Sequence, residues 1–60
     1  MTPFALMASL AGISHREAAE ICGVRLDTVR SWASGRNRTP SGALDDLRRL
    51  VERQERAAAQ

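Results

Sequence analysis

Hydrophobic side chains recur at helical spacing along the chain, and the sequence shows no pair of strands. A first helix begins at Thr2 and Pro3, since a hydroxyl N-cap followed by proline is typical of a helix start. Gly12 ends it. Its apolar residues predict a helix that packs against the rest of the domain: Phe4, Leu6, Met7, Leu10 and Ile13.

The stretch from His15 to Ser34 predicts two short helices joined by a sharp turn at Gly23, where glycine adopts a positive φ without steric cost. The first helix of this pair begins at a capping box formed by Ser14 and Glu17, and the second helix of the pair begins near Leu26. Small or apolar residues occupy the places that such a pair buries: Ala18, Ala19, Cys22, Val24, Val29 and Trp32. This pattern predicts a helix-turn-helix unit, whose second helix is built to enter a DNA major groove.

Thr39 and Pro40 repeat the start signal, and a fourth helix extends from there to about Ala58. Its apolar stripe consists of Leu44, Leu47, Leu50 and Val51. A helix of about five turns is longer than a three-helix core requires. We therefore predict that part of this stripe forms a dimer interface; the alternative is that all of it packs within one copy. Opposite charges four residues apart support the helix: Asp45 with Arg49, Arg48 with Glu52, and Glu52 with Arg56.

The length of 60 residues predicts one small domain over residues 1–60, and the four predicted helices make its class all-α. A chain of this size buries only about 60% of its unfolded surface, so its core is marginal. The single cysteine allows no internal disulfide, and no cysteine–histidine set is present for zinc. Oligomerisation is the other common way to stabilise so small a domain, so we expect a homodimer.

The nine basic residues are all arginine, and their distribution is uneven. Residues 1–24 carry one arginine against two glutamates, and residues 41–60 carry four arginines against four acids. Residues 25–40 carry four arginines against Asp27 alone, a net charge of +3. The positive charge therefore lies on the second helix of the unit and on the loop after it, where phosphate contacts would be made.

The residues from about Leu10 to Val51 resemble the Cro and phage-repressor (Xre-type) helix-turn-helix family, in their run of turn, second helix, tryptophan, glycine, basic loop, proline and following helix. One position departs from the family pattern. The family usually has glutamate where this chain has Ala33, and that glutamate often pairs with an arginine of the first helix. In this chain the first helix carries no charge. The resemblance implies a Cro/repressor-like fold. It also leaves Ile21, at a usually outward position, open between a contact with the fourth helix and one with a partner.

The helix geometry and the resemblance together give a set of candidate DNA contacts. At about 100° per residue, the second helix of the unit presents a polar face opposite Val29. By resemblance, base edges are met by Arg25, Leu26, Asp27 and Ser31, and the start of the helix before it rests on a phosphate. The basic loop would clamp phosphates. The candidates are His15, Arg16, Arg25, Leu26, Asp27, Thr28, Arg30, Ser31, Ser34, Arg36, Asn37 and Arg38.

Some of these residues have simpler explanations. His15 can be an ordinary exposed residue beside the helix cap. Asp27 suits the first turn of any helix because of the helix dipole, and phosphates would repel it. The loop from Arg36 to Arg38 can be a solvated loop.

The first functional hypothesis is a sequence-specific repressor that acts as a homodimer on an inverted-repeat operator in double-stranded DNA. The alternative is an antitoxin or adaptor-type protein-interaction module that uses the C-terminal helix. An excisionase-like architectural protein would usually show a β-hairpin wing.

Catalysis is not expected, because the sequence has no plausible nucleophile–base pair, no metal-ligand set and no phosphate-binding glycine loop. We accordingly expect no cofactor, no metal and no small-molecule ligand. The N-terminus is apolar but lacks a basic leader and a cleavage site, and it is too short to span a bilayer. These features predict a cytoplasmic protein without a membrane partner.

Overall fold

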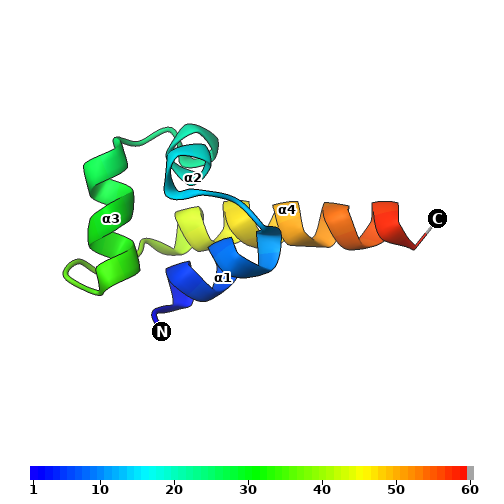
Figure 1. The fold of residues 1–60 in the computed structure, drawn as a ribbon, viewed down its shortest axis with the longest axis horizontal. Coiled ribbons are helices and arrows are strands. Elements are labelled where there is room, and N and C mark those ends of the chain that lie inside the picture. The colour runs from blue at the N-terminus through cyan, green and yellow to red at the C-terminus, as the bar shows by residue number, and fades with distance from the viewer. Residues whose placement is uncertain (60) are drawn as a thin grey trace.

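The computed structural model describes residues 1–59 and is all-α. Its four helices are α1 (Pro3–Ala11), α2 (His15–Cys22), α3 (Leu26–Ser34) and α4 (Ser41–Ala58). The helices α1 and α2 flank the long α4, and α3 lies across one end of the molecule, where it contacts α1 and α2 (Figure 1). The predicted class, an all-α four-helix fold, is confirmed. None of the helices in the described residues is both long and apolar enough to cross a membrane.

The helix starts of α1 and α2 follow the predicted capping residues. The Thr2 hydroxyl accepts from the Ala5 N–H at 3.1 Å and donates to the carbonyl oxygen of Ala33 at 3.2 Å. The predicted N-cap thereby also ties the start of α1 to the end of α3. In the capping box of α2, the Glu17 N–H donates to Ser14 Oγ at 3.1 Å, and the Ser14 N–H donates to Glu17 Oε1 at 2.9 Å.

The turn between α2 and α3 depends on Gly23, which has a φ of 69°. Its N–H donates to the Glu20 carbonyl at 3.3 Å, and the Val24 N–H donates to the Ala19 carbonyl at 3.0 Å. These two bonds satisfy carbonyl groups that the end of α2 would otherwise leave open. The left-handed conformation costs other residues steric strain, which explains why a glycine occupies this position.

The core is centred on Phe4, Val29 and Leu47, which are fully buried. Trp32 lies against Phe4 with the two rings nearly edge to face and their centroids 5.6 Å apart, a favourable aromatic geometry. The predicted inward positions of Val29 and Trp32 are therefore confirmed. The complete buried cluster is Phe4, Ala8, Ala18, Ala19, Val29, Trp32, Ala43 and Leu47.

The outer face of α1 differs from the prediction. Leu6 and Leu10 are 50% and 61% exposed, whereas Ala8 and Ala11 are buried. The reason is geometric: α1 buries the face of Phe4, and residues four and seven positions further on share that face. The alanines let neighbouring helices approach closely, and the larger leucines are left on the far side.

The prediction that Leu47 belongs to a dimer interface is wrong, because this side chain is fully buried within one copy. Leu44 is half-buried and packs against the same core, and Leu50 and Val51 are also half-buried. The inner stripe of α4 is therefore largely used by the fold itself. The helix begins at Ser41 with Pro40 as N-cap, and the Thr39 side chain makes no capping bond.

The ion pairs of α4 agree in part with the prediction. Arg48 lies 3.7 Å from Glu52, and Arg56 lies 3.9 Å from the same carboxylate. Arg49 pairs with Asp46 at 3.6 Å, however, and Asp45 pairs with Arg48 at 3.4 Å. These pairs are exposed, so each adds little to stability.

A side chain of α4 closes the end of α1. Gln54 Nε2 donates to the carbonyl oxygen of Ala11 at 2.9 Å. This bond satisfies one of the last carbonyls of α1, which have no partner within the helix. The two residues are 43 positions apart, and no local sequence signal indicates their pairing.

Candidate nucleic-acid interface

The helix α3 begins at Arg25, its N-cap, without a side-chain hydrogen bond. The N–H groups of Thr28 and Val29 both donate to the Arg25 carbonyl oxygen, at 3.1 and 3.2 Å. The Arg25 side chain is exposed, and Leu26 and Thr28 beside it are half-buried. This end of α3 therefore combines a free guanidinium group with the positive end of the helix dipole.

The open face of α3 carries a pair of opposite charges. Arg30 Nη1 lies 3.9 Å from Asp27 Oδ1, and the two side chains are 64% and 88% exposed. Because the pair is long and solvated, it is weak and leaves both groups free to meet another molecule. The arginine also offsets the repulsion that the aspartate alone would exert on a phosphate.

Ser31 corrects the expected set of contact residues. It lies opposite Val29 as predicted, but it is only 2% exposed. The loop after α3 folds back over it, and the Asn37 N–H donates to the Ser31 carbonyl oxygen at 3.2 Å. The Ser31 hydroxyl donates to the Thr28 carbonyl oxygen at 2.7 Å. Its side chain is therefore sealed inside the protein and does not reach a base edge in this conformation.

The basic loop is presented to the surface. Arg36, Asn37 and Arg38 are exposed, and so is Ser34 at the end of α3. The Ser34 hydroxyl accepts from the Arg36 N–H at 3.3 Å, which fixes the first residue of the loop. The loop thus projects two guanidinium groups beside the C-terminal end of α3.

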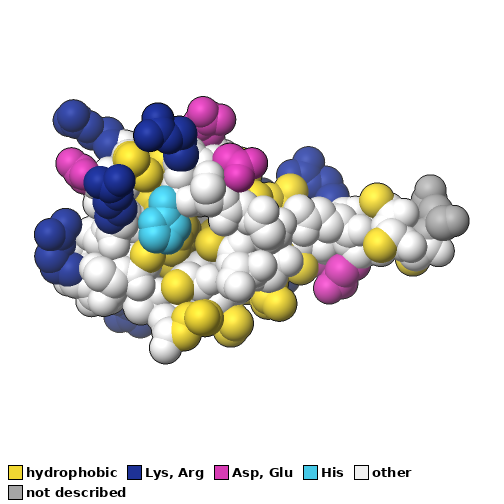
Figure 2. All heavy atoms as spheres, viewed as in Figure 1, with side chains coloured by type: hydrophobic (Ala, Val, Ile, Leu, Met, Phe, Trp, Pro, Cys, Tyr) yellow, Lys and Arg dark blue, Asp and Glu magenta, His cyan; other side chains and the backbone are white. Residues whose placement is uncertain are grey.

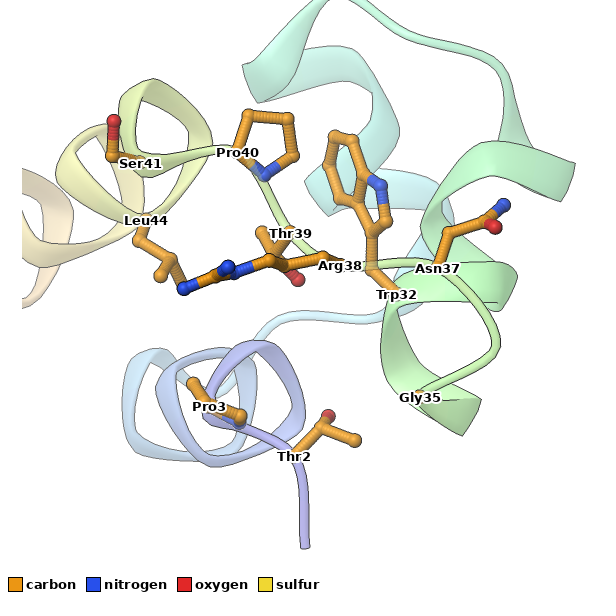
Figure 3. Close-up of a pocket in the computed structure, with 10 residues that line it drawn as sticks. All are labelled: Thr2, Pro3, Trp32, Gly35, Asn37, Arg38, Thr39, Pro40, Ser41 and Leu44. Carbon is orange, nitrogen blue, oxygen red and sulfur yellow. The ribbon is translucent and has the colours of Figure 1, made fainter.

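Arg38 also borders a cleft of about 740 Å³ between the start of α1, this loop and the start of α4. Its side chain points across the cleft toward Leu44 (Figure 3). The other lining residues are Thr2, Pro3, Trp32, Gly35, Asn37, Thr39, Pro40 and Ser41. Among the described residues that line it, Arg38 carries the single charged side chain.

The start of α2 presents the exposed side chains of His15 and Arg16. The carboxylate of Glu17 already occupies the positive end of this helix, where it accepts the Ser14 N–H. A phosphate at this place would therefore depend on the Arg16 guanidinium more than on the helix dipole. The His15 ring lies 6.4 Å from the Phe4 ring, between centroids.

The candidate contacts gather at one end of the molecule. In Figure 2, arginine side chains with acidic ones among them surround the end that α2 and α3 form. Of the residues expected from the sequence, the exposed ones are His15, Arg16, Arg25, Asp27, Arg30, Ser34, Arg36, Asn37 and Arg38. We use the term basic end for α3, its start at Arg25 and the loop to Arg38.

Cys22 does not belong to this surface. It is half-buried and packs against the core, as expected for a structural thiol. Burial raises its pKa, and the negative charge of Asp46 adds to the shift. The neutral thiol is therefore favoured, which is the opposite of the low pKa that a reactive cysteine needs. Among residues 1–59, no three potential metal-ligating side chains lie together.

Ile21 lies outside the basic end. It is 42% exposed and lines a hollow of about 480 Å³ between α2 and α4. The hollow is otherwise lined by charged residues of α4: Asp46, Arg49, Glu52, Arg53 and Arg56. The side chain therefore faces α4 without being covered by it.

Comparison with known proteins adds no relative: no family model, curated protein or solved structure matches this chain. The functional argument therefore depends on the arrangement of the helices and of the charges.

Proposed function

We propose that the chain is a sequence-specific DNA-binding regulator of the Cro and phage-repressor (Xre-type) kind, which acts as a homodimeric repressor in the cytoplasm. The observation that carries the proposal is the basic end. A short helix, held against α2 by a three-residue turn, presents Arg25, Asp27 and Arg30 to solvent and continues into an exposed loop with two more arginines.

In this proposal α3 enters the major groove with its N-terminal end foremost. Arg25 would read a guanine, since a guanidinium matches its two acceptor atoms in that groove. Arg30, Arg36 and Arg38 would lie against phosphates on either side. Two copies on an inverted repeat require half-sites centred about one helical turn apart.

The experiment is a selection from a randomised DNA duplex, followed by binding titrations on the recovered sequence. Enrichment of an inverted repeat with that spacing supports the proposal. The salt dependence tests the arginines: each neutralised phosphate contributes about 0.9 to the slope of log affinity against log salt. Three phosphate-binding arginines in each of two copies therefore predict a slope of about −5.

Arg30→Ala should weaken binding by about tenfold or more and reduce the salt slope by about two in a dimer. Arg53→Ala is the matched control, because it removes the same charge from α4, outside the basic end. Equal effects of the two substitutions would show that only net charge matters. Failure to enrich any sequence would remove the proposal.

The alternative, a protein-interaction module, has one observation in its favour. Ile21 is an exposed apolar side chain within a charged hollow, and protein interfaces often surround an apolar contact with a polar rim. Of the C-terminal stripe expected for this role, Leu47 is fully buried, and the other three residues are half-buried in the fold. Absence of DNA binding, together with a partner whose affinity depends on Ile21, would favour this alternative.

A further inference from the structure

The outer side of α1 is an apolar surface without a partner in this structure. Leu6 and Leu10 are one turn apart, so they lie on one face, and both are exposed. Pro3 is exposed on the same side, and Met7 beside it is half-buried. Hydrophobic atoms gather along the edge of the molecule where α1 lies (Figure 2). We call Pro3, Leu6, Met7 and Leu10 the α1 face.

The charge of this surface indicates what can cover it. The helix α1 has no charged residue from Pro3 to Ala11, whereas α2, α3 and α4 all carry charged side chains on their outer sides. A two-fold axis places each surface against its own copy. A face without charge meets itself without like-charge repulsion, and it offers nothing that would select an acidic or a basic partner.

Ile21 provides the contrast. Among the described helices it is the other large hydrophobic side chain that is exposed, but the hollow around it is lined by three arginines together with Asp46 and Glu52. A two-fold contact there would take the charged side chains of both copies out of water, and the loss of their hydration is costly. Of the two apolar places, only the α1 face suits a second copy of this chain.

The position of α1 also leaves the N-terminal end of α3 free. Thr2, at the start of α1, bonds to Ala33 at the far end of α3, away from Arg25. A dimer formed through the α1 face would therefore place the axis nearer the C-terminal ends of both α3 helices. The two N-terminal ends, with Arg25, would point away from it.

We propose that the α1 face is the homodimer interface, in place of the α4 stripe. The proposal deepens the proposed function, which needs two copies on DNA. A standard interface takes about 800 Å² from each partner, close to a fifth of the 4268 Å² that the chain exposes. Nine residues of one helix supply less than this, so the dimer should dissociate at micromolar concentrations and be completed when two half-sites hold the copies together.

The test is sedimentation equilibrium without DNA, from micromolar to millimolar concentrations. The wild-type chain should pass from monomer to dimer in this range. Leu10→Glu should raise the dissociation constant by about tenfold or more, because each dimer receives two buried carboxylates. Leu6→Glu should act in the same way. Ile21→Glu, a matched substitution at an exposed leucine-sized residue, should leave the equilibrium unchanged.

All three positions are exposed, so far-ultraviolet circular dichroism should show that the variants remain folded. A wild-type chain that stays monomeric to millimolar concentration would overturn the proposal, and so would equal dissociation by Ile21→Glu. The result is independent of DNA. A dimer that depends on Leu10 but binds no operator would keep this inference and remove the proposed function. An inverted repeat bound by a chain that stays monomeric without DNA would remove this inference and keep the proposed DNA binding.

Discussion

The same substitution, glycine to alanine, should have opposite effects at two positions of this chain. Gly42 lies in the first turn of α4 with ordinary helical geometry, and an added Cβ would meet nothing within 4 Å. Gly42→Ala should therefore stabilise the protein by about 0.5–1 kcal/mol, through helix propensity and a less flexible unfolded chain. Gly23 has equally open space but a φ of 69°. The left-handed conformation costs an L-residue about 1–2 kcal/mol, of which the stiffer unfolded chain offsets part.

Gly23→Ala should therefore destabilise the protein by about 0.5–1 kcal/mol. Gly12 provides a matched control, since its φ is also 69° and the space around it is also open; its alanine variant should show the same loss. Gly35 combines a φ of 84° with a close neighbour, because an added Cβ would lie 3.3 Å from the Thr2 Cγ2 atom. Gly35→Ala should therefore be the least stable of the four variants.

The assay is urea and thermal unfolding followed by circular dichroism, at one fixed protein concentration because the proposed dimerisation would contribute to stability. The expected order of stability is Gly42→Ala, wild type, Gly12→Ala together with Gly23→Ala, and then Gly35→Ala. For a domain of this size, a gap of about 1.5 kcal/mol between the Gly42 and Gly23 variants corresponds to about 6–12 °C in Tm. Equal signs at Gly42 and Gly23 would refute the reasoning, since only the backbone conformation distinguishes the two positions.

Two further predictions concern the core. Leu47→Ala should destabilise the chain by about 3 kcal/mol or more, because the side chain is fully buried and its loss leaves a cavity; a loss below about 1 kcal/mol in urea unfolding would show that Leu47 is not a core residue. For Cys22, burial raises the pKa in the folded state, so the unfolded chain ionises first as the pH rises. The contribution of the thiol to the stability of the fold is therefore complete below its pKa in the unfolded chain. It is lost as the pH rises through the raised pKa of the folded chain. The chain has no lysine or tyrosine to titrate in that alkaline range, and Cys22→Ala should abolish the decline.

Most helix boundaries were predictable because their signals are local. The Thr2 cap, the capping box at Ser14 and the stop at Gly23 each depend on residues within a few positions, and all three are present in the structure. The inward direction of Val29 and Trp32 follows from the steep crossing that the pair of short helices requires. These features could be derived before any tertiary contact was known.

The errors concern residues whose environment is set outside their own helix. Ser31 lies on the side of α3 that helical periodicity marks as open, and the loop carrying Asn37 closes over it. Nothing near Ser31 in the sequence indicates that closure. The bond from Gln54 to Ala11 is likewise tertiary, and neither residue type is distinctive at its position.

The composition of the core relates the burial of Leu47 to the exposure of Leu6 and Leu10, the two findings that differ from the prediction and bear on assembly. Half of the core cluster found in residues 1–59 consists of alanines, which let the helices approach closely but remove little apolar surface from water. Leu47 supplies part of what the alanines lack, and it is therefore absent from the surface of α4. Leu6 and Leu10 would supply more, but α1 turns its alanines inward and its leucines outward. In such a small domain, covering these two leucines with a second copy would add apolar burial that the monomer core cannot obtain, which supports the proposal of α1 rather than α4 as the homodimer interface.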